Sequence, residues 1–169
     1  MTTKRKTSKS YLQLVEFFKQ AYESGIIRSY KIPEINKKSC GRFKVYKPEI
    51  DGIIFDSGLE AKFYVHLLEE IQAGVVDSFT RQQAFELQPS FKLGDKRVSK
   101  IRYIADFVVT YKDGNVIVID VKGRETPDFR LKKKLFEYKF RMPLYCVQYY
   151  DGQWLRLEDI KKLKRNREI

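Results

Sequence analysis

Two aspartates and a lysine lie on two consecutive strands that the sequence predicts for the centre of a sheet. Asp106 belongs to the mostly apolar run Arg102–Tyr111, and Asp120 and Lys122 belong to the next such run, Val116–Lys122. Acidic side chains are seldom buried unless a cation or a hydrogen-bond donor accompanies them. The first chemistry to consider is therefore a pair of carboxylates that holds a cation.

The connection between these two strands decides whether the two aspartates share a face of the sheet. Its sequence is Tyr111-Lys112-Asp113-Gly114-Asn115, which suits either a two-residue Asp-Gly turn or a three-residue loop with Gly114 in the left-handed conformation. The three-residue loop sets Asp106 directly opposite Asp120, with Cβ atoms about 4.5–5.5 Å apart. The two-residue turn would put them on opposite faces, because a slip of one residue inverts the pattern. We predict the three-residue loop.

Two opposed carboxylates in a sheet repel each other and are poorly solvated, so both stay ionised only with a cation between them. Carboxylate oxygens suit Mg²⁺, and Mn²⁺ is expected to substitute. Lys122 follows Asp120 by two residues and so projects from the same face. We expect Asp106, Asp120 and Lys122 to meet around a metal-activated water or a phosphate. The alternative is that Lys122 only neutralises Asp120 at a strand end, which gives a protein without catalysis.

A third acid, Glu60, lies in the first turn of a helix predicted from Ser57 to Gly74. Ser57 and Glu60 have the S-x-x-E spacing of a capping box, which by itself favours a structural role. Glu60 also borders the apolar stripe of that helix, which must pack on the sheet. We therefore expect Glu60 to join the two aspartates at the site.

The pattern of the whole chain predicts an α/β fold, a mixed central sheet flanked by helices. Residues 1–50 are expected to hold a basic tail, a helix and a connection, 51–157 the core, and 158–169 a basic helix. The expected helices are Tyr11–Ser24, Ser57–Gly74, Pro127–Phe140 and Glu158–Ile169, and the remaining strands are Arg42–Tyr46, Gly52–Phe55, Ser78–Gln82, Phe85–Leu87, Leu144–Tyr149 and Gln153–Leu157. The segment Met1–Lys9 is expected to be disordered until it meets phosphate.

The chain carries 34 Lys and Arg against 22 Asp and Glu, a formal net charge of +12. Such a surplus attracts polyanions, with nucleic acid the first partner to consider and an anionic membrane the second. No run approaches the roughly 18 apolar residues of a spanning helix, and the N-terminus lacks an apolar signal core, so we expect a soluble intracellular protein. Cys40 and Cys146 have no further Cys or His at metal-ligand spacing, so zinc is not expected.

Basic and hydroxyl side chains follow the second aspartate strand closely. Arg124 and Thr126 come directly after it, and Lys132, Lys133 and Lys134 lie on the helix predicted next. A run of lysines is commonly a solvated helix face, but this run begins beside the expected site. We expect these five residues to contact DNA phosphates.

An acid on a helix, an aspartate on a strand and Asp-x-Lys on the adjacent strand together resemble the PD-(D/E)-x-K nuclease superfamily. The residues that carry the resemblance are Glu60, Asp106 in Tyr103-Ile104-Ala105-Asp106-Phe107, and Asp120-Val121-Lys122-Gly123. From Gly52 to Phe136 the chain looks most like phage nuclease-like proteins allied to endonuclease I junction resolvases and to the end-cleaving subunit of heteromeric transposases. It departs from the superfamily pattern at Ala105, where proline is usual, and at Asp120, where glutamate is frequent.

The resemblance implies a restriction-endonuclease-like core and a Mg²⁺-dependent endodeoxyribonuclease that leaves 5′-phosphate and 3′-hydroxyl ends. It implies metal binding by Asp106, Asp120 and the Val121 carbonyl, with Glu60 completing the shell directly or through water. It also implies a Holliday junction or other branched DNA as substrate, a homodimer, and a cytoplasmic location, in the bacterial host cell if the protein is phage-encoded. Two other functions are compatible with the residues: a nicking or recombination nuclease that needs a partner, and a basic DNA-binding module without catalysis.

Overall fold

The computed structural model describes residues 9–33 and 47–167, which form two compact units, Met1–Gln72 and Ala73–Ile169. Each unit is described by itself. Residues 1–8 of the basic tail expected over Met1–Lys9 and the strand expected over Arg42–Tyr46 lie outside the described residues. Lys9, expected in that tail, is instead the first residue of a helix. The division falls after Gln72, so the helix that carries Glu60 belongs to the first unit and the strands that carry the aspartates belong to the second.

The first unit joins two helices and a small antiparallel sheet in the order β1-β2-β3. Its elements are α1 (Lys9–Glu23), β1 (Tyr30–Lys31), β2 (Glu49–Ile50), β3 (Ile53–Ile54) and α2 (Gly58–Gln72). Leu14 of α1 lies so close to Gly58 that a Cβ added there would stand 2.9 Å from Leu14 Cδ2. The glycine therefore allows the two helices to pack against each other. Both helices fall where the sequence predicts them.

The turn between β2 and β3 is shorter than the sequence suggests. The strands expected at Arg42–Tyr46 and Gly52–Phe55 leave residues 47–51 between them, but Glu49 and Ile50 are paired in β2, and the turn is Asp51-Gly52, with φ angles of 52° and 78°. Two consecutive positive φ angles match a two-residue turn whose twist suits a hairpin. The Asp51 carboxylate also accepts hydrogen bonds from the N–H groups of Arg28 and Ser29, at 2.7 and 2.9 Å.

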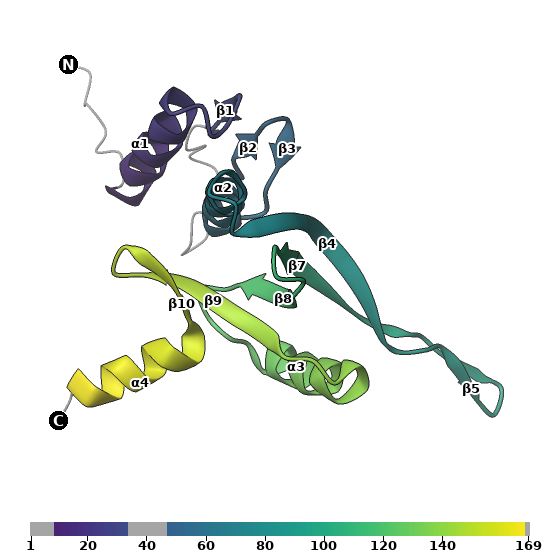
Figure 1. Ribbon diagram of the computed structural model, residues 1–169. Coiled ribbons are helices and arrows are strands. Elements are labelled where there is room, and N and C mark those ends of the chain that lie inside the picture. Colours follow the sequence, from purple (N-terminus) through teal and green to yellow (C-terminus); the bar gives the residue numbers. More distant parts are fainter. Residues whose placement is uncertain (1–8, 34–46, 168–169) are drawn as a thin grey trace, which may run out of the picture. The chain divides into compact units, whose positions relative to one another are not determined.

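The second unit is built on a five-stranded sheet in the order β10-β9-β8-β7-β4 (Figure 1). Its elements are β4 (Val76–Gln88), β5 (Phe91–Leu93), β6 (Lys96–Val98), β7 (Ile101–Tyr111), β8 (Val116–Val121), α3 (Pro127–Phe140), β9 (Leu144–Tyr150), β10 (Gln153–Arg156) and α4 (Leu157–Arg167). β8 and β9 are parallel and the other neighbours are antiparallel. The mixed α/β class expected from the sequence is confirmed.

Helix α3 returns the chain from β8 to its parallel neighbour β9, and its ends are marked in the sequence. Thr126 is the N-cap, its Oγ accepting from the N–H of Phe129 at 3.2 Å, and Pro127 opens the first turn, where its missing N–H costs nothing. Arg141 closes the helix in the left-handed conformation, with φ of 55°. Phe129 and Phe136 of α3 pack into the core against one face of the sheet.

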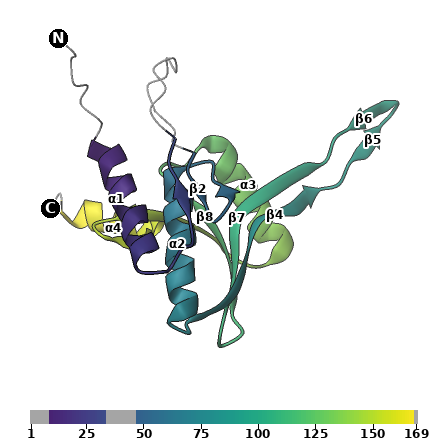
Figure 2. The same ribbon diagram turned by 90° about the horizontal axis from the view of Figure 1, so that it is seen from above.

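Strand β4 is the edge of this sheet and is longer than predicted. The two strands expected over Ser78–Gln82 and Phe85–Leu87 form one strand, which bends at Gln82, where φ is 51°. Beyond Gln88 and Ile101 the ribbon of β4 and β7 continues into the hairpin of β5 and β6, which we did not predict from the sequence (Figure 2). Among the described residues, no helix is long and apolar enough to cross a membrane.

Candidate active site

The hairpin of β7 and β8 has the three-residue loop that we predicted. The N–H of Tyr111 donates to the carbonyl of Asn115 at 2.8 Å, and the N–H of Gly114 donates to the carbonyl of Tyr111 at 3.0 Å. Gly114 has φ of 84°, which a side chain would strain. The pairing that this loop sets runs as far as Phe107 opposite Ile119.

If this register continued, the next pair would be Asp106 and Asp120. At this point a side-chain carboxylate, that of Asp106, accepts a backbone N–H of β8. Asp106 Oδ2 accepts from the N–H of Val121 at 2.8 Å, and Gln82 Nε2 lies 3.4 Å from Asp106 Oδ1. Asp106 is half-buried. Its carboxylate is thus fixed at the end of the two central strands, beside the backbone that follows Asp120.

Asp120 is the one charged residue of the described chain that is fully buried, with 1% of its surface exposed. The hydroxyl of Tyr103 donates a hydrogen bond to its Oδ1. Lys122 Nζ lies 2.7 Å from its Oδ2, although this oxygen accepts no hydrogen bond of regular geometry from the described residues. A phenol and an ammonium group therefore compensate the burial of this carboxylate, as a buried charge requires.

Side chains of β7 point alternately to the two faces of the sheet, but this alternation is broken once near Asp106. Tyr103 and Ala105 belong to the core cluster under α3, and Val108 packs against the same cluster, although a regular strand would turn odd and even positions to opposite faces. On β4, the partner position of Asp106 is Gln82, whose positive φ interrupts the pairing between the two strands. Because of this break, the phenol of Tyr103 lies on the same face of the sheet as the buried carboxylate of Asp120.

The electrostatics of the site keep both the phenol and the amine protonated. Burial, followed by the negative charges of Asp120 and Asp106, raises the pKa of Tyr103 far above its ordinary value. Burial by itself would lower the pKa of Lys122, but the charge of Asp120, its hydrogen bond and the charge of Asp106 outweigh this and raise it. Both aspartates therefore act on the same two groups, and Lys122 is an ammonium ion at neutral pH.

Cys146 is the neighbour of Asp120 on β9, and it is buried. Burial and the negative charges of Asp120 and Glu125 raise the pKa of its thiol to about 12. A thiol with such a pKa is uncharged at neutral pH.

Replacing Tyr103 by phenylalanine is expected to lower the free energy of unfolding by about 1–3 kcal/mol, because an oxygen of a buried carboxylate loses its donor. Urea unfolding measures the change. Tyr138→Phe is the matched control, since the Tyr138 side chain is 70% exposed and should tolerate the loss of its hydroxyl. Equal stability of Tyr103→Phe and Tyr138→Phe would mean that the phenol does not stabilise Asp120.

Glu60 takes part in the capping box that the sequence predicts. Ser57 Oγ donates to Glu60 Oε1 at 2.9 Å, and the N–H of Glu60 donates to Ser57 Oγ at 3.1 Å. Glu60 is half-buried in α2, within the first unit. The structure therefore brings Asp106, Asp120 and Lys122 together. The contacts of Glu60 with Ser57 are those of a helix cap, and a role of Glu60 in the site stays a prediction.

The five residues predicted to contact phosphate differ in their surroundings. Arg124 and Lys134 are exposed. Thr126 caps α3, and Lys132 pairs with Asp128 at 3.0 Å. Lys133 is the most enclosed, because its Nζ pairs with Glu137 at 2.9 Å and donates to the carbonyl of Leu144. Arg124 and Lys134 are thus better placed for an external anion than Lys133.

The donor set at the end of β7 and β8 suits a hard divalent cation. Two carboxylates, from Asp106 and Asp120, and the backbone carbonyl of Val121 offer oxygen ligands, which Mg²⁺ and Mn²⁺ prefer. The buried Asp120 Oδ2 lacks a hydrogen-bond donor and has only the ion pair with Lys122, so it fits a cation ligand. Within residues 9–33 and 47–167, no group of three or more Asp, Glu, His or Cys side chains is arranged to hold a metal.

Comparison with known protein families assigns the chain to one of them. The model of the family described as "Protein of unknown function (DUF1064)" matches residues 40–163, which is most of the chain. The chain belongs to the DUF1064 family. The match includes Glu60, both aspartates and Lys122, so the whole candidate site lies within the part that defines the family. No curated protein matches the chain.

Tyr103 is the site residue that we did not predict from the sequence. In regular alternation, Tyr103 and Asp106 stand three residues apart and so face opposite sides of a strand. The one sequence signal for a different geometry is the polar pair Gln82-Gln83 in the middle of the neighbouring strand, where an apolar residue would be expected in a regular edge strand.

Proposed function

We propose that this DUF1064 protein is a metal-dependent DNA endonuclease whose catalytic residues are Asp106, Asp120 and Lys122. The observation that carries the proposal is the meeting of two aspartates and a protonated lysine at the end of the two central strands, with Lys122 Nζ 2.7 Å from Asp120 Oδ2. The net charge of +12 favours a polyanionic substrate. Glu60 is proposed as a further acid of the same site.

The reaction is hydrolysis of a phosphodiester. The oxygen of a water forms a bond to phosphorus, the bond from phosphorus to the 3′ oxygen breaks, and the leaving oxygen takes a proton, which gives 5′-phosphate and 3′-hydroxyl ends. Asp106, Asp120 and the Val121 carbonyl would hold Mg²⁺, which supplies positive charge against the phosphate and lowers the pKa of a water. Lys122 would orient or activate that water and offset negative charge in the transition state.

A divalent cation on Asp120 Oδ2 would replace the ion pair with Lys122 and would leave the ammonium group for the phosphate. The Lys122 side chain is 32% exposed and lies over the Phe129 ring, with Nζ 5.2 Å from the ring centroid. A long, partly exposed side chain can turn toward a phosphate, and the Phe129 ring stabilises the ammonium group by a cation–π contact. Lys122 compensates the charge of Asp120 in this structure, and with a cation at Asp120 it would compensate the charge of the phosphate instead.

The substrate we propose is branched DNA such as a four-way junction, cut in the cytoplasm by a homodimer. A nuclease panel tests this: labelled junction, flap, nicked, single-stranded and linear DNA are incubated with Mg²⁺ or Mn²⁺ and resolved on denaturing gels. Nicking of the junction in preference to linear duplex is the expected result. Equal cutting of plain duplex would contradict the proposed preference for junctions. Activity that appears only with a host extract would favour the partner-dependent nuclease.

A second function, a DNA-binding module without catalysis, is favoured by one observation. Tyr103 and Lys122 together compensate the buried carboxylate of Asp120 without any metal. Calorimetric titration with Mn²⁺ separates the two functions. A stoichiometric site that Asp120→Asn removes supports the nuclease, and no heat of binding together with no cleavage of any DNA supports the binding module.

A further inference from the structure

The hairpin of β5 and β6 projects beyond the sheet of the second unit, and no part of the proposed active site lies on it. This β5–β6 arm comprises residues 89–100, and all of its residues are exposed except Val98, which is half-buried (Figure 2). Its turn is Gly94-Asp95, where Gly94 has φ of 58° and Leu93 pairs with Lys96. A two-residue turn with glycine first is one of the favoured hairpin turns, so the arm is a defined ribbon.

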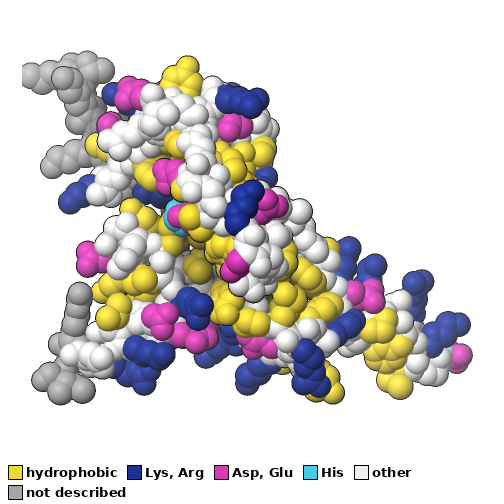
Figure 3. All heavy atoms as spheres, in the orientation of Figure 1, with side chains coloured by type: hydrophobic (Ala, Val, Ile, Leu, Met, Phe, Trp, Pro, Cys, Tyr) yellow, Lys and Arg dark blue, Asp and Glu magenta, His cyan; other side chains and the backbone are white. Residues whose placement is uncertain are grey.

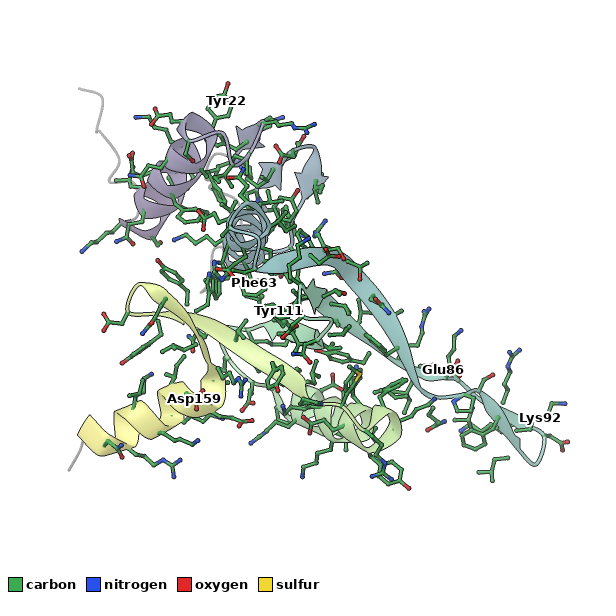
Figure 4. The ribbon with its side chains drawn as sticks, viewed as in Figure 1. Tyr22, Phe63, Glu86, Lys92, Tyr111 and Asp159 are labelled. Carbon is green, nitrogen blue, oxygen red and sulfur yellow. The ribbon has the colours of Figure 1, made fainter. Side chains whose placement is uncertain are left out.

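The two faces of the arm have different chemistry. Lys92 pairs with Arg97, so these two cations lie directly opposite each other on one face, while Phe91 pairs with Val98 and Leu93 with Lys96 on the other, mainly apolar face. Phe91 is 44% and Leu93 is 70% exposed. Apolar and basic side chains stand together on the arm in Figure 3, and Figure 4 places Lys92 near its tip and Glu86 where it leaves the sheet.

The basic face, formed by Lys92 and Arg97, carries no acidic side chain on either strand. The arm as a whole has four basic residues, Lys92, Lys96, Arg97 and Lys100, and one acid, Asp95, a net charge of +3. Like charges directly opposite each other destabilise a ribbon. Neither Lys92 nor Arg97 forms an ion pair with any residue that the structure describes, so a bound anion would relieve their repulsion.

Three occupants could cover an apolar and basic ribbon, and the geometry favours one. If the apolar face entered a membrane, Lys92 and Arg97 would point away from the lipid headgroups. A second copy of this chain would bury only three apolar side chains there, far less than the roughly 800 Å² per partner of a stable interface. DNA with unstacked bases offers phosphates to the cations and apolar base faces to Phe91 and Leu93.

We propose that the β5–β6 arm is a second DNA-binding surface that recognises a branch point, with Lys92 and Arg97 on phosphates and with Phe91 and Leu93 against unstacked bases. This deepens the proposed function, on which the choice of DNA as partner rests. The arm supplies selection of branched over linear DNA, and the site at the end of β7 and β8 supplies cleavage.

Fluorescence anisotropy of the full chain tests this, with a labelled four-way junction and a linear duplex of equal length in EDTA. Lys92→Ala with Arg97→Ala should weaken binding to both DNAs roughly tenfold near 0.1 M salt. The slope of log K against log salt should fall by about 2, because each of the two cations neutralises one phosphate. Phe91→Ser with Leu93→Ser should weaken junction binding roughly tenfold and leave duplex binding within about twofold.

Two double variants serve as matched controls. Arg28→Ala with Lys31→Ala removes the same charge from exposed positions outside the arm, and Leu131→Ser with Leu163→Ser removes exposed apolar side chains. The proposal is overturned if the arm variants bind both DNAs like the wild type or lose no more affinity than these controls. It is also overturned if Phe91→Ser with Leu93→Ser abolishes binding to anionic vesicles or self-association instead of junction binding.

Binding in EDTA needs no catalysis, so failure of the arm proposal and failure of the nuclease proposal give different results. If the wild type binds the junction through the arm but cuts no DNA, the arm proposal stands and the nuclease proposal is wrong. A wild type that cuts DNA while the arm variants bind and cut normally would reject the arm alone.

Discussion

Asp120→Asn is expected to abolish DNA cleavage, with a loss of at least about 10²–10³-fold in rate, the scale for removing a group that organises charge in the transition state. Asparagine keeps the shape of the side chain and an oxygen that accepts the hydrogen bond of Tyr103. It lacks the negative charge that a divalent cation needs. Cleavage of labelled DNA in Mg²⁺ under single-turnover conditions measures the loss, and thermal unfolding shows that the variant is folded.

Asp77→Asn is the matched control. Asp77 is an exposed acid of the same unit, and its Oδ1 pairs with Lys112 Nζ at 2.6 Å. This hydrogen bond with Lys112 lowers the pKa of Asp77, so the substitution removes a charge of the same kind. Full activity of Asp77→Asn together with inactivity of Asp120→Asn assigns the effect to the site. Cleavage by Asp120→Asn at the wild-type rate would contradict a catalytic role of this carboxylate.

The central hairpin could be predicted because its geometry is local. The loop between β7 and β8 contains one glycine at the position that a three-residue loop needs, and the loop then fixes every pair up to Phe107 and Ile119, the residues next to Asp106 and Asp120. Helix α3 was predictable for the same reason, since Thr126 and Pro127 mark its first turn. Features that a few neighbouring residues determine are visible in the sequence.

The position of Tyr103 could not be predicted, because it depends on a distortion shared by two strands. The break in alternation at Asp106 involves Gln82, which is 24 residues away in sequence and adopts a positive φ without being glycine. Apart from the polar pair Gln82-Gln83, nothing local in the sequence indicates such a bend. The arm was missed for a different reason: Phe91-Lys92-Leu93 and Lys96-Arg97-Val98 alternate around Gly94-Asp95, a hairpin signal that was present but short.

Glu60 shows where a motif supports two roles equally well. The spacing Ser57 to Glu60 fits a capping box, and both hydrogen bonds between these two residues are formed. The same residue type at the same place is what the resemblance to nucleases assigns to the metal shell. Local geometry settles the capping and leaves the second role to experiment.

Lys122→Met is expected to separate catalysis from structural support. The variant keeps much of the side-chain volume but leaves Asp120, which is 1% exposed, with Tyr103 as its remaining partner. Cleavage should fall at least about 10²-fold, because charge on the phosphate is no longer offset. The free energy of unfolding should fall by about 3 kcal/mol, the lower end for breaking a buried ion pair, because the Lys122 side chain is 32% exposed.

The double variant Lys122→Met with Asp120→Asn completes the test. Without the buried charge, the methionine no longer leaves a carboxylate uncompensated, so most of the lost stability should return while cleavage stays absent. Urea unfolding of the four proteins gives the coupling energy of the pair, and Lys122→Arg shows whether any cation suffices. Additive effects on stability would mean that Lys122 does not compensate Asp120. Wild-type cleavage by Lys122→Met would mean that the amine serves the fold alone, and that the chemistry of this site, if any, depends on the two aspartates.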